Sequence, residues 1–349
     1  MSIAVAGVVG RRPTVHSRAW TRSVGLVGAI ALLAAVTACS LAYGAKAMPL
    51  QTVWDAFNEF DPHNNDHLIV RSLRVPRTVI GLLVGAALGL AGAVMQGVTR
   101  NPLADPALLG IEAGASLAVV AGISAFSIGT LSGYVWFALA GAAIASAVVY
   151  GLSSFGHRGS TPLKLALAGT AVAALLSSLT SAILLLDVTT LDQFRFWVVG
   201  SLAGRDDSII WDVVPFLAVG ALLSLGVGWG LNTLALGDDV ARGLGQRVAL
   251  VRVIAAFAVV LLCGAATAAA GPIAFVGLTV PHVARAICGP DYRWILPWSM
   301  VLAPTLLLGA DVIGRVVARP GEIQVGIVTA IIGAPFFVVI VRRRHLVQL

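Results

Sequence analysis

The stretch RVPRTVIGLLVGAALGLAGAVMQGVTRNPLADPALLGIEAGAS, from Arg74 to Ser116, decides how this chain is organised. It begins with two arginines around Pro76 and continues with residues 78–98, which carry no charge. At about 1.5 Å per residue, such a run crosses the ~30 Å hydrocarbon core of a bilayer as one helix. A polar break at 99–102 follows, and then a second apolar run begins. The stretch therefore predicts a charged rim, a membrane helix, a turn and a second membrane helix.

The composition places the rest of the chain in a membrane as well. Of its 349 residues, 58% are hydrophobic and 11% are charged, whereas soluble proteins carry about 25% charged residues. We predict an all-α, polytopic membrane protein with about ten transmembrane helices. Its membrane domain is expected at 23–341, between a cytoplasmic tail at 1–22 and a basic tail at 342–349. The ten apolar spans are 23–45, 78–98, 107–128, 134–154, 163–186, 211–231, 252–270, 273–288, 295–310 and 325–341.

The first span also has the features of a signal peptide. Four arginines between positions 11 and 22 precede the apolar run, and Val36–Cys39 resembles a lipoprotein cleavage box. The apolar run continues past Cys39 to Ala45, however. This continuation favours a retained transmembrane helix over a cleaved leader.

The distribution of Lys and Arg predicts the orientation of the chain, because inner loops carry the excess of these residues. With ten spans and the N-terminus inside, the inner segments hold fifteen Lys and Arg against five Asp and Glu. The outer segments hold eight Lys and Arg against eleven Asp and Glu. The bias predicts that both termini lie in the cytoplasm.

An internal echo in the sequence indicates an inverted repeat of spans 2–5 and 7–10. An odd number of spans separates the two halves, so they are expected to have opposite orientations, as in many transporters. Compositional coincidence in a chain this rich in Gly and Ala is the alternative. Eight residues recur at an offset of 179: Gly85, Ala86, Ala87, Ala91, Gly92, Pro102, Ala107 and Gly110 match Gly264, Ala265, Ala266, Ala270, Gly271, Pro281, Ala286 and Gly289.

Several motifs together resemble the iron-siderophore and cobalamin permease family of ABC importers. The first stretch supplies R-x-P-R at 74–77, Gln96-Gly97, and N-P-L-A-D-P-x-x-L-G-x-x-x-G-A at 101–115. Later segments extend the resemblance over most of the chain: GPIAFVGLTVPHVAR at 271–285, DYRW at 291–294 and IIGAPFF at 331–337.

The resemblance implies a permease subunit in the bacterial cytoplasmic (inner) membrane. Within the family the chain looks most like the ferric enterobactin permease subunits, which implies uptake of a ferric siderophore; cobalamin or haem uptake is the alternative. The expected partners are a homologous permease subunit (in a heterodimer or homodimer), two ATPase subunits and an external siderophore-binding protein. ATP and Mg are expected on the ATPase, with no cofactor in this chain and no nucleic-acid partner.

Three outer arginines are expected to dock the binding protein. Arg74, Arg77 and Arg315 match family positions that meet glutamates on the binding protein, and Arg71 and Arg319 are two further candidates. Arg suits this role because its guanidinium makes bidentate contacts with carboxylates. Headgroup anchoring, or pairing with nearby acids such as Glu322, is the simpler alternative.

The inner loop between spans six and seven resembles the family's coupling helix, which seats on the ATPase. Asp238 suits the start of a short helix, and the glycines near 243–245 end it. A plain connector is the alternative. The residues assigned to ATPase coupling are Leu236, Gly237, Asp238, Asp239, Ala241, Arg242, Leu244 and Gly245.

The resemblance implies an inner gate at Asn101, Pro102 and Leu103, where proline ends the second span. A tight turn with no gating role is the alternative. On the outer side, the aromatic segment Asp192–Ser201 matches the family's FW-x-x-G-S pattern. We expect it to anchor at the membrane interface, with substrate contact as the alternative.

Other function classes lack their signature residues. The sequence has no Walker A pattern, so ATP must bind to another subunit. Apart from residues near the span ends, such as Glu112 and Asp311, the spans carry no Lys, Arg or carboxylate, which disfavours an ion-coupled secondary transporter. A membrane enzyme is disfavoured because no nucleophile–base pair is visible. No catalytic residue or metal ligand is predicted, and the outer loop that contains His63, Asp66 and His67 is expected to be solvated.

Overall fold

The computed structural model describes residues 15–44, 46–154, 162–205 and 207–342. Within these ranges every regular element is helical, which confirms the predicted all-α class. Seven helices are long and apolar enough to cross a membrane, and three shorter apolar helices complete the ten predicted spans. The ten are α1 (Val15–Ala42), α4 (Val75–Thr99), α5 (Ile111–Phe126), α6 (Leu131–Ser154), α7 (Pro162–Leu186), α9 (Asp207–Gly226), α12 (Val248–Ala270), α13 (Val276–Cys288), α14 (Tyr292–Val317) and α15 (Val325–Arg342).

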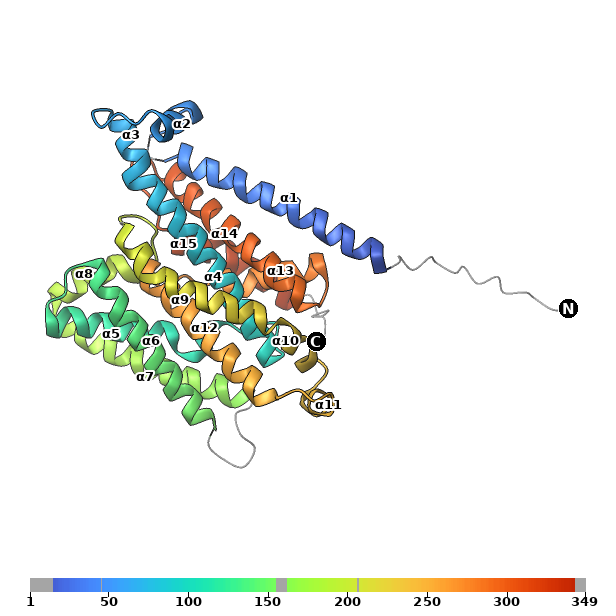
Figure 1. The fold of residues 1–349 in the computed structure, drawn as a ribbon. Helices are drawn as coiled ribbons and strands as arrows, with labels where there is room; N and C mark the ends of the chain where they lie inside the picture. Colours follow the sequence, from blue (N-terminus) through green and yellow to red (C-terminus); the bar gives the residue numbers. More distant parts are fainter. Residues whose placement is uncertain (1–14, 45, 155–161, 206, 343–349) are drawn as a thin grey trace.

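Short helices lie at the two ends of this bundle (Figure 1). One end, which we call the α3 end, carries α2 (Leu50–Asn58), α3 (Asn65–Ile69) and α8 (Val188–Val198). The opposite end, which we call the α11 end, carries α10 (Gly228–Leu234) and α11 (Asp238–Gly243). A π-helical turn at Val70–Arg74 precedes α4, and a 3-10 turn at Pro106–Leu109 precedes α5.

Helix α4, which comes from the stretch Arg74–Ser116, lies at the centre of the bundle and packs against α12, α13 and α14. Its glycines permit this close approach. A Cβ on Gly92 would lie 1.8 Å from the carbonyl oxygen of Gly277, and one on Gly85 would lie 2.4 Å from Cα of Pro304. Small residues at such crossings are typical of helix packing in lipid.

Helix α13 is too short to cross a bilayer alone. At about 1.5 Å per residue its 13 residues reach about 20 Å, so the predicted span 273–288 is only partly helical. The segment before it is irregular, and Phe275 has a φ of 69°. A Cβ on Gly333 of α15 would meet the Phe275 side chain, so α15 shields this irregular backbone.

One other predicted boundary was wrong. The span 211–231 was expected as one helix, but α9 ends at Gly226 and α10 begins at Gly228, where successive glycines weaken the helix. The outer loop after span one, which was expected to be solvated, contains α2 and α3. Asn64 explains the second helix, because its side chain accepts a hydrogen bond from the backbone NH of Asp66 and caps α3.

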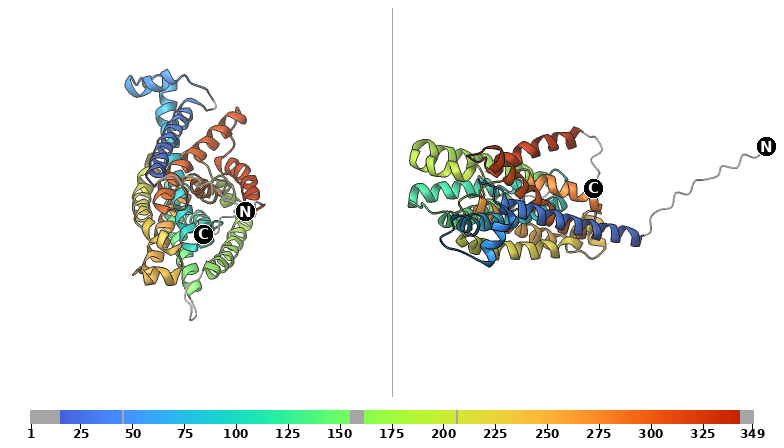
Figure 2. Two further views of the ribbon diagram at one scale, coloured as in Figure 1. Left: turned by 90° about the vertical axis from the view of Figure 1, so that its right-hand side faces the viewer. Right: turned by 90° about the horizontal axis from the view of Figure 1, so that it is seen from above.

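The packing of the helices follows the predicted repeat. Helix α4 packs on α14 as α12 packs on α6, and α5 packs on α6 as α13 packs on α14. Figure 2 shows the same helices from two further sides. The offset of 179 holds only for α4 and α12, however. Beyond them it pairs the turn at 100–110 with helix α13, so the later sequence matches do not mark equivalent positions.

Candidate functional site

A buried salt-bridge cluster joins α4 to α14 at the α3 end. Arg77 holds both carboxylate oxygens of Asp311: its Nη2 lies 2.7 Å from Oδ1, and its Nε lies 3.0 Å from Oδ2. Its Nη1 donates to Glu322 Oε2 at 2.7 Å. Asp311 is fully buried, so this bidentate geometry offsets the cost of removing its charge from water.

The other two arginines of this region secure the end of α1. Arg315 contacts Asp311 at 2.9 Å and donates from Nη1 to the carbonyls of Ser40 and Tyr43 at 3.0 and 2.9 Å. Arg74 donates to the carbonyls of Leu41, Ala42 and Lys46. The last carbonyls of a helix have no partner within it, and these guanidinium groups supply one. We call Arg74, Arg77, Arg315, Asp311 and Glu322 the arginine cluster.

The structure therefore differs from the open docking surface that the sequence led us to expect. Arg74 and Arg315 are only 5% and 4% exposed, because distant carbonyls and Asp311 surround them. The simpler alternative, pairing with Glu322, is confirmed for Arg77. The side chains of Arg77 and Glu322 remain 13% and 37% exposed, so a partner that approaches the cluster meets these two first.

The two further candidate arginines lie at the surface. Arg71 donates to the carbonyls of Ala56 and Phe57, and Arg319 donates to the carbonyl of Gly44. In the loop after span one, Lys46 bonds Asp66 at 2.6 Å, and His67 Nδ1 accepts from a backbone NH. The described residues contain no group of three His, Cys, Asp or Glu that would hold a metal ion.

At the opposite end, Asp238 fixes the predicted coupling helix to the bundle. Gly237 precedes α11 with a φ of 103°, a conformation that favours glycine. Asp238 then bonds Arg252 of α12 at 3.0 Å and Arg100, at the end of α4, at 3.2 Å. The expected pair of Asp238 with Arg242 is looser at 3.9 Å, since Arg242 lies closer to Asp239 at 3.1 Å.

Three apolar residues around α11 are left exposed by the described part of the chain. Leu236, Val240 and Leu244 are 61%, 51% and 66% exposed, and they recur four residues apart, as on one face of a helix. Ala241 is fully buried and packs inward. An exposed apolar group rimmed by charged side chains marks an interaction surface.

The predicted inner gate is a tight turn beside α11. Arg100 ends α4 in the left-handed region, with a φ of 51°, and the NH of Asn101 donates to the carbonyl of Gln96 at 3.2 Å. Asn101 Oδ1 accepts from the NH of Leu103 at 3.0 Å, which closes a turn around Pro102. Because Arg100 also bonds Asp238, one salt bridge links the predicted gate to the predicted coupling helix.

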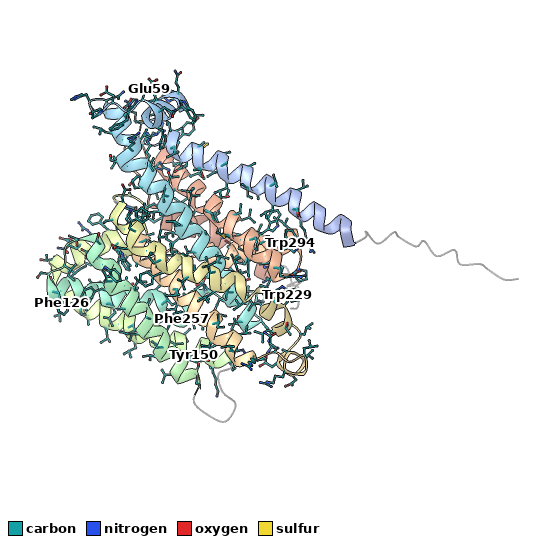
Figure 3. All side chains as sticks on the ribbon, viewed as in Figure 1. Glu59, Phe126, Tyr150, Trp229, Phe257 and Trp294 are labelled. Carbon is teal, nitrogen blue, oxygen red and sulfur yellow. The ribbon has the colours of Figure 1, made fainter. Side chains whose placement is uncertain are left out.

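Aromatic residues mark the depth of the bundle in a membrane. Figure 3 shows Trp229 and Trp294 at the α11 end and Phe126 at the α3 end. Arg293 lies over the Trp229 ring, 4.6 Å from its centroid. Arg293 also bonds Asp291 and holds the pKa of that carboxyl at about 2. Tryptophan beside charged side chains is typical of a membrane interface.

The aromatic segment at the α3 end fits the predicted interface role only in part. Phe194 and Trp197 are 4% and 2% exposed and lie on the buried side of α8, while Phe196 is 63% exposed.

Sequence reasoning missed two further groups at this end. Arg205 is buried although it is charged, and Asp311 is the acid at the centre of the arginine cluster. Asp311 could have been identified from the sequence because it lies four residues before Arg315, a spacing that brings two side chains together on one face of a helix.

Comparisons with known proteins agree with this architecture. The model of the FecCD transport family matches residues 32–343. The ferric enterobactin transport system permease protein FepD of Escherichia coli is 47% identical over 329 residues, covering 94% of this chain and 98% of FepD. The probable siderophore transport system permease protein YfiZ of Bacillus subtilis is 42% identical over 326 residues, covering 93% of this chain and 98% of YfiZ.

Two further comparisons point the same way. The iron(3+)-hydroxamate import system permease protein FhuB of Bacillus subtilis is 40% identical over 94% of this chain and 85% of FhuB. An inward-facing structure of a metal-chelate type ABC transporter superposes with a TM-score of 0.79 at 28% identity, covering 91% of this chain and 98% of that one. On these matches, the chain belongs to the FecCD transport family.

Proposed function

We propose that this chain is the permease subunit of an ABC importer that moves a ferric siderophore across the bacterial cytoplasmic membrane. Membership of the FecCD transport family and the ten-helix fold support the proposal. The observation that carries it is the surface around α11. Its uncovered apolar residues sit beside the Asn101–Leu103 turn, and the Arg100–Asp238 salt bridge joins the two. A transporter without its own ATP site needs such a contact with a separate ATPase.

In this proposal the α11 end faces the cytoplasm and the α3 end faces outward. The excess of Lys and Arg in the inner segments supports this orientation, and both termini then lie inside. Leu236, Val240 and Leu244 insert into the ATPase, and a rotation of α11 is transmitted through Asp238 and Arg100 to the turn that closes the inner mouth. Two ATPase subunits, which bind ATP and Mg, drive two permease chains.

The arginine cluster forms the floor of the docking site for an external binding protein. A glutamate on that protein competes with Glu322 for Arg77, the most accessible arginine of the cluster. Arg74 and Arg315 are buried and act indirectly. They hold the end of α1 against α14 and keep the net charge of the cluster positive. Docking then depends on charge, and salt weakens it.

The proposed cargo is a ferric siderophore, with ferric enterobactin as the specific expectation. FepD, YfiZ and FhuB are named for ferric enterobactin, siderophore and iron-hydroxamate transport, and their high coverage supports a cargo of this class. The partner permease is a homologous chain, in a heterodimer or a homodimer.

The test is uptake of ⁵⁵Fe chelates by a strain that lacks this chain. A panel of ferric tricatecholate, ferric trihydroxamate and ferric citrate is supplied, with the chain restored from a plasmid. We expect restoration to rescue uptake of ferric enterobactin, together with whichever other siderophores the system accepts. Unchanged uptake of every chelate after deletion and restoration would rule out the proposed function.

A further inference from the structure

A polar cavity of about 300 Å³ lies at the α3 end and is distinct from the core of the arginine cluster. Helix α6, helix α8, the segment 199–205 and the segment 321–324 form its walls. The lining residues with polar groups include Tyr134, Gln193, Trp197, Ser201, Arg205 and Gln324. The volume is at the lower end of the range for small-molecule sites, about 300–1,000 Å³.

Arg205 is the unusual member of this lining. Its side chain is buried, and the residue is 6% exposed. Its Nε donates to the carbonyl of Ser201 at 3.2 Å, but no carboxylate of the described residues forms a salt bridge with it. Arg77 and Arg315, which are also largely buried, both hold Asp311. A buried cation without an anion is costly unless something else supplies the charge.

The guanidinium remains charged under physiological conditions. Burial lowers the pKa of Arg205 to about 10, which is still well above neutral pH. Glu322 also lines the cavity, but its carboxylate is 2.7 Å from Arg77 and is already engaged there. The cavity therefore presents a positive charge that no carboxylate of the described chain balances.

The remaining lining groups suit a ligand with oxygen atoms and flat rings. Trp197 Nε1 is a buried donor without a hydrogen-bond partner among the described residues. The Tyr134 hydroxyl donates a long hydrogen bond to Gln193 Oε1, at 3.4 Å, which an oxygen atom of a ligand can replace. Phe196 and Trp197 add aromatic surface. The planar guanidinium group matches carboxylates and makes two parallel hydrogen bonds with them.

We propose that this cavity receives an anionic oxygen-bearing arm, carboxylate or catecholate, of the ferric chelate as it leaves the binding protein, with Arg205 as its counter-ion. The inference rests on the proposed function and adds to it a preference for negatively charged chelates over neutral ones. A small chelate arm fits better than a protein side chain because Arg205 is only 6% exposed.

The test measures uptake kinetics in the complete transporter, with partner subunits and binding protein present. An anionic ferric tricatecholate and a neutral ferric trihydroxamate are compared in wild type, Arg205→Gln and Arg205→Lys. Charge-assisted hydrogen bonds predict that Arg205→Gln raises KM for the anionic chelate about tenfold or more, with KM for the neutral chelate unchanged. Arg205→Lys is expected to recover part of the loss. Arg195→Gln is the matched control, since Arg195 lies on α8, which also lines the cavity, but is exposed and paired with Asp192.

A second variant keeps the test independent of folding. Gln193 is exposed and lines the cavity, so Gln193→Glu adds a negative charge without disturbing the core. It is expected to raise KM for the anionic chelate only. Equal effects on both chelates, or no effect from either variant, would overturn the proposal.

Two further outcomes distinguish this proposal from a protein-docking role of the cavity and from failure of the proposed function. Binding of the iron-free binding protein to the transporter is expected to be unchanged in Arg205→Gln. If that binding weakens as much as uptake does, the cavity is part of the protein-docking surface and the proposal is wrong. If the wild type takes up neither chelate, the proposed function fails rather than the inference about Arg205.

Discussion

Arg100, at the end of α4, lies 3.2 Å from Asp238, the first residue of α11. The same Asp238 oxygen lies 3.0 Å from Arg252 of α12. One carboxylate therefore connects the turn after the central helix, the short helix on the surface and the helix that follows it. In the proposed mechanism, a movement of α11 reaches the turn at Asn101 through this contact.

Replacing Arg100 with glutamine should reduce coupling more than stability. The pair is partly exposed, at 34% and 22%, and such pairs contribute about 0.2–1 kcal/mol to stability. We expect assembly and ATP hydrolysis to persist while uptake per ATP hydrolysed falls several-fold. The measurement is the ratio of transport to phosphate release in proteoliposomes. Arg293→Gln, which removes a contact with Asp291 at the same end of the bundle, is the control, and an equal ratio in wild type and Arg100→Gln would contradict the link.

A charge on the uncovered face of α11 should detach the ATPase. Val240 is 51% exposed, so Val240→Glu leaves the permease fold intact but opposes burial of this face against a partner. We expect co-purification of the ATPase subunit to drop at least tenfold. Asp192→Ala, at a side chain that is 57% exposed on α8 at the opposite end, should have little effect. Full ATPase recovery with Val240→Glu would place the ATPase contact elsewhere.

The binding-protein interface should respond to Glu322. Glu322→Gln removes the internal competitor for Arg77, so we expect the binding protein to bind up to several-fold more tightly, as for a partly exposed ion pair. Arg77→Glu should weaken binding and make it less sensitive to salt. Surface plasmon resonance at low and high ionic strength measures both effects. If neither variant changes the affinity at low salt, the arginine cluster has only a structural role.

Asp311 should be the most sensitive carboxylate for stability. Asp311→Asn leaves Arg77 and Arg315 without their shared buried anion, and breaking a buried pair costs about 3–5 kcal/mol. We expect a large fall in the melting temperature of the detergent-solubilised protein. Asp66→Asn, which breaks the exposed contact with Lys46, should change it little. Similar melting temperatures for the two variants would show that the cluster does not stabilise the fold.

The ten spans could be predicted because each one is a local property of the sequence. An apolar run long enough to cross a bilayer is visible without knowledge of its neighbours. Boundaries failed where a few residues decided the outcome, as at Gly226–Gly228, where α9 separates from α10, and at Asn64, whose side chain caps α3. The short α13 was read as longer because the segment 271–275 is apolar although its backbone is irregular.

The candidate sites divide in the same way. The start of α11 and the turn at Asn101 follow from local residues, Gly237 and Pro102, and both form at the expected positions. The environment of the arginines could not be predicted, since Asp311 follows Arg77 by 234 residues and Ser40 precedes Arg315 by 275. The sequence motifs identified three outer arginines. Their burial depends on how α1, α4 and α14 pack together, which the sequence does not reveal.

The central claim is that ATP hydrolysis on a separate subunit drives this chain to import a ferric siderophore. The most direct test is uptake of ⁵⁵Fe-labelled siderophore by proteoliposomes that contain this permease, its partner permease and the ATPase, with binding protein added outside. The account predicts accumulation only when ATP and Mg are enclosed, and none with an ATPase that cannot hydrolyse ATP. Accumulation that follows an imposed proton or sodium gradient in the absence of ATP would contradict it.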